Sequence, residues 1–254
     1  MDGDFLTLLK ERGLTAPPLA AAGPGGHAVE TTEGTTILAL RFAGGVLVAG
    51  DRRATMGNTV VYDRADKVLA VDDRSVLALS GAPANAYEIA RLLEISFQHY
   101  RRSQLQELSL DGRLRTLSRL LRDNLPMALQ GIGAVVPIYA TYEAAAQTGH
   151  IYFCDVLGAQ FETVDFCTTG SGSAVIRGAL YYLNRWDRPF ASLSEEEALV
   201  LVLKMLETAA EYDTATGGYK PVARIFPQIM RVAADGINTI AEAALEPLYA
   251  ARLG

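Results

Sequence analysis

Residues 34–55 read GTTILALRFAGGVLVAGDRRAT, and this stretch decides the fold of the chain. Residues 35–42 alternate in polarity and are rich in β-branched side chains, which favours a strand. The AGG at residues 43–45 favours a tight turn, because glycine adopts backbone angles that other residues avoid. VLVAG at residues 46–50 then returns as a second strand. We therefore predict a β-hairpin over residues 36–50.

The remaining elements come in groups of like kind. Apolar, β-branched runs predict strands, and apolar side chains at helical spacing predict helices. A capping box at Ser194 and Glu197 marks the start of one of these helices. The predicted strands lie at 67–71, 75–80, 135–142, 149–155, 161–169 and 224–234. The predicted helices lie at 84–102, 112–130, 173–186, 194–211 and 238–252.

This order of elements indicates the fold class. Strands occur in antiparallel groups and helices in consecutive pairs, whereas a doubly wound parallel sheet would alternate single strands and helices. Two helix pairs need two apolar surfaces to cover. We therefore expect an α+β protein, a four-layer αββα sandwich of two stacked antiparallel sheets between helix layers.

Residues 1–34 differ from the rest of the chain. A short amphipathic piece, DFLTLLKERG, precedes a stretch dominated by Pro, Gly and Ala, which offers little to pack. Taken alone, this segment is a flexible tail or a removable leader. Residues 35–254 contain no repeat of fixed period and no linker, so we expect one domain there.

Composition limits the classes of function. The 254 residues are 50% hydrophobic and 20% charged, with a formal net charge of −6, which argues against nucleic-acid and membrane-surface binding. No apolar run approaches the roughly 20 residues that span a bilayer. The N-terminus lacks the basic and apolar regions of a secretory signal. We expect a cytoplasmic protein.

Common catalytic signatures are missing from the sequence. Cys154 and Cys167 lie in strand-like runs and are expected to be small buried hydrophobes, and His99 is expected on the surface. No metal-ligand spacing links the three histidines to cysteines or carboxylates, so no metal and no cofactor is predicted. The chain has no G-x-S-x-G elbow, P-loop or H-E-x-x-H motif.

A threonine stands at the junction between leader and domain. A hydroxyl needs a base, and an N-terminal threonine carries one, since its α-amino group has a pKa of about 7.7–8.0. Gly34-Thr35 would supply such a residue if the chain were cut between them. The glycine leaves the scissile carbonyl unhindered. The tripeptide GTT alone is nevertheless a weak signal, because it usually marks only the start of a strand.

Further motifs make the signal specific. GTTILAL is followed in order by GDRRAT (50–55), DKV (66–68), SGA (80–82), GSGS (170–173) and DTATGG (213–218). With this set of motifs the chain resembles a proteasome β subunit, most closely the bacterial kind, over nearly all of residues 34–235. The resemblance implies the N-terminal-nucleophile hydrolase fold. It also implies a propeptide, residues 1–34, that is removed autocatalytically between Gly34 and Thr35.

The resemblance assigns a role to each matching residue. Thr35 is the nucleophile, and Asp51 and Lys67 are a buried pair beside it, for which the alternative is an ordinary exposed ion pair. Gly81 provides an oxyanion-hole N–H, or simply ends a strand. Ser171 contacts the threonine amine with Asp213 as its acidic partner, or caps a helix. Thr216 stands where many relatives have serine.

The positions of the specificity pocket also follow from the resemblance. They are small or apolar here, which favours cleavage after apolar residues. One departure from the family is Pro83, which has no N–H to pair with an extended substrate. The pocket positions are Ala54, Thr55, Ala65, Leu69, Leu79 and Pro83.

The implied function is a threonine endopeptidase, the catalytic β subunit of a 20S proteasome core particle that degrades unfolded or tagged proteins. Its implied partners are α subunits, other β subunits in rings of seven, a ring-shaped ATPase and polypeptide substrates. Three alternatives remain: a two-ring ATP-dependent protease of the same fold, which commonly lacks the Arg52-Arg53 pair, a non-catalytic ring subunit, and a small-molecule amidohydrolase of the same superfamily.

Overall fold

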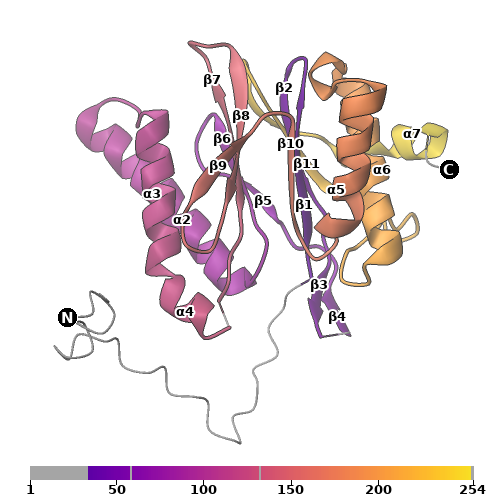
Figure 1. Cartoon of the computed structure of the whole chain (residues 1–254), viewed down its shortest axis with the longest axis horizontal. Helices are drawn as coiled ribbons and strands as arrows, with labels where there is room; N and C mark the ends of the chain where they lie inside the picture. The colour runs from indigo at the N-terminus through magenta and orange to yellow at the C-terminus, as the bar shows by residue number, and fades with distance from the viewer. Residues whose placement is uncertain (1–33, 58, 132, 253–254) are drawn as a thin grey trace, which may run out of the picture.

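The structure is a computed structural model that describes residues 34–57, 59–131 and 133–252. The predicted leader therefore lies outside the described residues, apart from Gly34. In the described part, strands and helices form four layers, with helices on the outside and sheets inside (Figure 1). The predicted α+β sandwich is confirmed.

Two antiparallel sheets form the centre of the described chain. The first has the order β10-β1-β2-β11-β12 and the second β5-β6-β7-β8-β9, while β3 and β4 make a separate hairpin. The strands of the first sheet are β1 (Thr36–Phe42), β2 (Gly45–Gly50), β10 (Phe166–Gly170), β11 (Gln228–Ala233) and β12 (Gly236–Thr239). The other strands are β3 (Ala54–Met56), β4 (Thr59–Tyr62), β5 (Val68–Ala70), β6 (Ser75–Ala78), β7 (Ile138–Glu143), β8 (Thr148–Cys154) and β9 (Gln160–Thr163).

Helices cover the outer face of each sheet. Figure 1 shows α2 (Pro83–Gln104) and α3 (Leu110–Asp123) on one side, and α5 (Ser173–Tyr182) and α6 (Glu195–Tyr212) on the other. The remaining α-helices are the short α4 (Leu125–Leu129) and the C-terminal α7 (Glu242–Arg252), and α5 is followed by a π-helical turn (Leu183–Asp187) and a 3-10 turn (Phe190–Ser192). Among the helices that the structure describes, none is long and apolar enough to cross a membrane.

Strand β1 explains why the sheets stack. Successive side chains of a strand point to opposite faces, and in β1 both faces are apolar. Leu38 and Leu40 pack against the core under α5 and α6. Ile37 and Ala39 pack into the core between the two sheets. Full burial of each large aliphatic side chain contributes about 1.5–3 kcal/mol. Because β1 buries side chains on both faces, it packs against the helix layer on one side and against the second sheet on the other.

Most predicted elements are present, and several details of the prediction were wrong. The helix predicted at 112–130 is two helices, α3 and α4, that meet at Asn124, because Pro126 has no N–H to continue the first. The strands predicted to begin at 135 and 224 begin at Ile138 and Gln228. The strand predicted at 161–169 is two strands, β9 and β10, which belong to different sheets. The helix predicted from residue 238 begins at Glu242, because Gly236–Thr239 pairs with β11 as β12. The β3–β4 hairpin was not predicted. The capping box at Ser194 and Glu197 is confirmed.

Candidate active site

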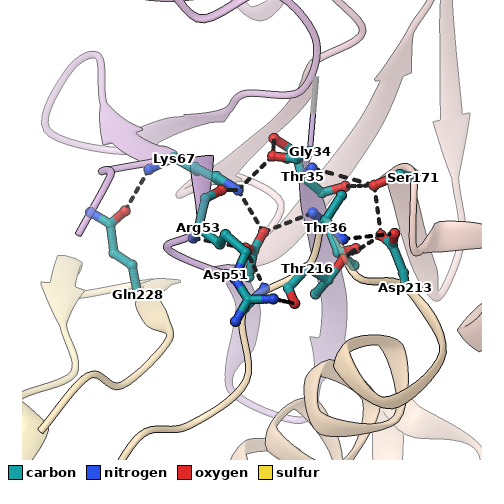
Figure 2. A network of polar contacts seen from close by, with 12 residues as sticks. Gly34, Thr35, Thr36, Asp51, Arg53, Lys67, Ser171, Asp213, Thr216 and Gln228 are labelled. Carbon is teal, nitrogen blue, oxygen red and sulfur yellow. Dashed lines mark hydrogen bonds and ion pairs between the residues drawn. The ribbon is translucent and has the colours of Figure 1, made fainter. Parts of the chain in front are cut away.

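The candidate residues gather at one end of the first sheet. Because β1 is antiparallel to β2 and β10, the start of β1 lies beside the ends of both, with Thr36 opposite Gly170 and Ile37 opposite Gly50. Thr35 therefore lies near Asp51, which follows β2, and Ser171, which follows β10. Figure 2 shows these side chains pointing toward one another, with Lys67 arriving from the second sheet.

Thr35 and Gly34 occupy the centre of this cluster. The Thr35 hydroxyl donates a hydrogen bond of 2.6 Å to the carbonyl oxygen of Gly34, and that oxygen also accepts one of 3.1 Å from Lys67 Nζ. Glycine is required before the threonine, since a Cβ at residue 34 would lie 2.3 Å from Thr55 Oγ1 and 2.7 Å from the Ala215 carbonyl. The peptide bond that precedes Thr35 is thus held against a hydroxyl and an ammonium group.

Lys67 and Asp51 form a buried ion pair. Lys67 Nζ lies 2.7 Å from Asp51 Oδ1, and the two side chains are 7% and 0% exposed, so the alternative of an exposed surface pair is wrong. The other partners of Asp51 are the backbone N–H groups of Thr36 (2.8 Å), Arg53 (2.9 Å) and Gly217 (2.9 Å). Burial lowers the pKa of Lys67 below its ordinary value, and Asp51 opposes that shift without cancelling it.

Ser171, Asp213 and Thr216 lie on the opposite side of Thr35. The Thr35 backbone N–H donates to Ser171 Oγ at 3.4 Å, and Ser171 Oγ donates to Asp213 Oδ2 at 2.6 Å. Ser171 is not the cap of α5, because the N-cap is Gly172 and no side chain caps the helix. The Thr216 hydroxyl donates to Asp213 Oδ2 at 2.6 Å and lies 2.6 Å from Thr36 Oγ1, so it contacts the neighbour of Thr35.

Replacing Thr216 by valine is expected to destabilise the protein by about 1–3 kcal/mol, because the buried Thr36 hydroxyl and Asp213 each lose a partner. Thr216→Ser keeps the hydroxyl and is the matched control, with a smaller expected loss. Urea unfolding of the three chains measures the difference. Equal stability of Thr216→Val and the parent would show that this hydroxyl contributes nothing.

Gly81 lines the same cavity as Thr35. The carbonyl of Ser80 accepts a hydrogen bond from the Val136 N–H. In a trans peptide the C=O and N–H point in opposite directions, so the Gly81 N–H points away from Val136. The Gly81 N–H therefore makes no hydrogen bond to residues 134–136. This arrangement suits a donor to an oxyanion, as the sequence predicts.

Gly81→Ala is expected to destabilise the chain by about 3 kcal/mol or more. Gly81 has φ +103, and a Cβ there would lie 2.0 Å from the Ala134 carbonyl oxygen. Gly178→Ala is the matched control, since nothing lies within 4 Å of its Cβ position, in the middle of α5. Urea unfolding should show Gly178→Ala slightly stabilised. A Gly81→Ala chain as stable as that control would contradict the close packing at Gly81.

A cavity of about 510 Å³ opens beside Thr35. Five of the six predicted pocket residues line it: Ala54, Ala65, Leu69, Leu79 and Pro83. Thr55 does not line it and lies behind Gly34. The cavity wall also includes six residues that were not predicted as pocket residues: Val61 and Tyr62 from β4, Arg64 and Asp66 from the loop that follows, and Ala86 and Tyr87 from α2.

Two further residues of the cluster were not assigned a role from sequence. Gln228, at the start of β11, accepts hydrogen bonds at 2.9 Å from the N–H groups of Lys67 and Val68 and so anchors the backbone of Lys67 (Figure 2). No sequence signal marks this glutamine. Arg53 accepts a hydrogen bond of 2.5 Å from Lys67 Nζ through its carbonyl. It lies within the quoted GDRRAT motif.

The two cysteines do not compete as nucleophiles. Both are buried and free, and burial raises the pKa of each thiol to about 12, so both are protonated near neutral pH. His99 is exposed, as predicted. In residues 34–252 as far as the structure describes them, no group of three or more His, Cys, Asp or Glu side chains is arranged to hold a metal.

Comparison with known proteins gives one consistent result. The profile of the proteasome subunit family matches residues 31–225. A proteasome subunit beta 2 of Thermomonospora curvata is 41% identical over 239 residues, which cover 94% of this chain and 83% of that protein. Proteasome beta subunits of Streptomyces griseus and Acidothermus cellulolyticus are each 39% identical, over 89% and 90% of this chain and 76% and 80% of theirs.

Proposed function

The chain belongs to the proteasome subunit family as a β-type subunit of the bacterial kind, and from that premise we propose that it is a threonine endopeptidase activated by cleavage before Thr35. One observation carries the proposal. The Thr35 hydroxyl and the Lys67 ammonium group both lie on the Gly34 carbonyl, at 2.6 and 3.1 Å, in a buried site with Asp51 as the counter-charge. The nucleophile (the Thr35 hydroxyl) and a cation that can stabilise an oxyanion (Lys67) thus both contact the peptide bond to be cut.

Activation proceeds by an acyl shift. The Thr35 Oγ attacks the Gly34 carbonyl carbon, and Lys67 stabilises the negative charge that develops on the carbonyl oxygen. The C–N bond then breaks, the hydroxyl proton passes to the departing nitrogen, and an ester joins Gly34 to the Thr35 oxygen. Water hydrolyses that ester. Residues 1–34 leave with a carboxylate, and Thr35 begins the chain with a free amine.

Substrate hydrolysis uses the same groups in new roles. The Thr35 amine accepts the proton of its own hydroxyl, whose proton affinity the nearby Lys67 charge lowers. The Gly81 N–H binds the oxyanion, a contact that typically contributes about 3 kcal/mol to transition-state stabilisation. Ser171, with Asp213 behind it, holds the amine in place. No metal or cofactor takes part in this sequence of steps.

The cavity beside Thr35 receives the side chain that precedes the scissile bond. Its wall is mostly apolar, with Leu69, Leu79, Val61 and small residues, and the charged Arg64 and Asp66 also line it. We therefore propose cleavage after apolar residues. Pro83 is the first residue of α2. It lines the cavity without offering an N–H, so the substrate backbone has one donor fewer on that side.

Assembly confines this activity. As a β-type subunit, the chain is proposed to form rings of seven that stack on rings of α subunits, with a ring-shaped ATPase admitting unfolded or tagged proteins in the cytoplasm. Residues 1–34 would mask Thr35 until the rings are complete. Enclosure of the site in such a chamber protects folded proteins from a protease with broad specificity.

The test is the intact mass of the chain, purified alone and after co-assembly with its α partner. We expect the full mass in the first sample and loss of residues 1–34, with a new N-terminus at Thr35, in the second. Hydrolysis of peptides with an apolar residue before the cut should appear with the shorter chain. An unprocessed chain in a complete particle would instead support the non-catalytic ring subunit.

A further inference from the structure

Arg52 and Arg53 form a pair whose side chains point to different parts of the site. Arg52 donates to Asp66 Oδ1 at 2.8 Å and to the Arg64 carbonyl at 3.2 Å, in the loop that carries pocket residue Ala65. The side chain of Arg53, 18% exposed, contacts the turn at residues 213–217 (Figure 2), and its Nε also lies 3.6 Å from Asp63 Oδ1. Of the two arginines, Arg53 is the one that hydrogen-bonds the 213–217 turn in the described residues.

Arg53 joins the two halves of the active site. Its main chain belongs to the lysine half, since its N–H donates to Asp51 Oδ2 at 2.9 Å and its carbonyl accepts from Lys67 Nζ at 2.5 Å. Its guanidinium belongs to the other half, donating to the carbonyls of Thr214 at 2.8 Å and Thr216 at 3.0 Å. Such charge-assisted bonds are stronger than neutral ones.

The turn that Arg53 binds carries the groups around the Thr35 nitrogen. It includes Asp213, whose carboxylate accepts a hydrogen bond from Ser171. It also includes Gly217, whose N–H donates to Asp51 Oδ2 at 2.9 Å. The contact is close, because a Cβ on Gly217 would lie 2.8 Å from the Arg53 Cβ. A shift of this turn would therefore move Asp213 and Ser171 relative to Thr35.

We propose that Arg53 is a positioning residue: its guanidinium fixes the 213–217 turn so that Asp213 and Ser171 hold the Thr35 amine at the distance that proton transfer requires. Arg53 touches no substrate in this role and acts through the turn. The inference rests on the proposed function of Thr35. A displacement of about 1 Å in a catalytic group can lower a rate about 100-fold, so the effect falls on kcat rather than on KM.

The experiment uses co-assembled particles, a fluorogenic peptide with an apolar residue before the cut, and rates divided by the fraction of chains with a free Thr35, measured by intact mass. Arg53→Ala is expected to lower kcat by about 10- to 100-fold with KM within about twofold of the parent. Arg53→Lys keeps the charge but not the planar guanidinium that places Nη1 on both carbonyls, so we expect an intermediate kcat. If Arg53→Ala does not assemble, Arg53→Lys carries the test.

Two variants separate positioning from general support. Arg41→Ala is the matched control, because Arg41 also donates to a backbone carbonyl, that of Gly149 at 2.6 Å, outside the site, and its kcat should equal the parent's. Arg52→Ala should mainly raise KM. A kcat for both Arg53 variants equal to the parent's, or a rise in KM as large as the fall in kcat, would overturn the inference while leaving the proposed function intact. A parent particle without free Thr35 or hydrolysis would overturn both.

Discussion

Thr35→Ala is expected to abolish peptide hydrolysis and to leave the Gly34–Thr35 bond uncut in the assembled particle. The substitution removes the hydroxyl that lies 2.6 Å from the Gly34 carbonyl, and no other hydroxyl or thiol is placed on that carbonyl in the described residues. Neither Cys154 nor Cys167 can replace it, since both are buried and protonated. Intact mass and a fluorogenic peptide assay measure the two losses.

Thr35→Ser is the control for this substitution. Serine keeps the oxygen and loses a methyl group, so both cleavage and hydrolysis should persist at a reduced rate. The fold should survive in both variants, because the Thr35 side chain donates only to the carbonyl next to it. If Thr35→Ala hydrolysed peptides at the parental rate, Thr35 would not be the nucleophile, and the proposed function would be wrong.

The layers of the fold were predictable because both sheets and helices carry clear periodicity. The junction between sheets was not. Residues 161–169 read as one continuous strand, and the chain passes from β9 to β10 within Val164-Asp165, without a glycine or proline to mark the break. Only the pairing partners, β8 for one half and β1 for the other, reveal the change of sheet.

Of the other misses, one had a turn signal that periodicity outweighed and one had no periodic signal. Asp235-Gly236 is a common turn pair, and Gly236 has φ +103, yet the apolar residues that follow favoured a helix. All four residues of β4 are exposed, so β4 shows no alternation between a buried and a solvated face. For the site, six short motifs predicted which residues meet. Gln228 lies outside all six motifs. Arg53 and the 213–217 turn each lie in a motif, but the motifs do not say that the two segments touch.

The surroundings of Asp51 indicate how the site responds when Lys67 is replaced. This carboxylate accepts from three backbone N–H groups in addition to Lys67. Those donors come from three separate segments, at residues 36, 53 and 217. Asp51 therefore organises the site as well as balancing the lysine charge, and its environment should persist when the lysine is removed.

Lys67→Met is accordingly expected to slow cleavage before Thr35, because the group that polarises the Gly34 carbonyl is gone. It should also lower peptide hydrolysis by about 100- to 10,000-fold, because the ammonium group that promotes loss of the hydroxyl proton is gone. Removing one partner of a buried ion pair typically destabilises a protein by about 3–5 kcal/mol. We expect the lower end of that range, since the three N–H groups still stabilise the Asp51 carboxylate. Intact mass, the peptide assay and urea unfolding measure these effects.

The double variant Asp51→Asn with Lys67→Met separates structure from chemistry. Removing both charges leaves no unpaired buried ion, so the stability of the double variant should exceed that of Lys67→Met. Hydrolysis and cleavage before Thr35 should stay as low as in the single variant, because neither change restores an ammonium group. If the double variant regains activity together with stability, Lys67 serves only the fold and another group assists Thr35. If stability returns without activity, the ammonium group itself is needed for the reaction.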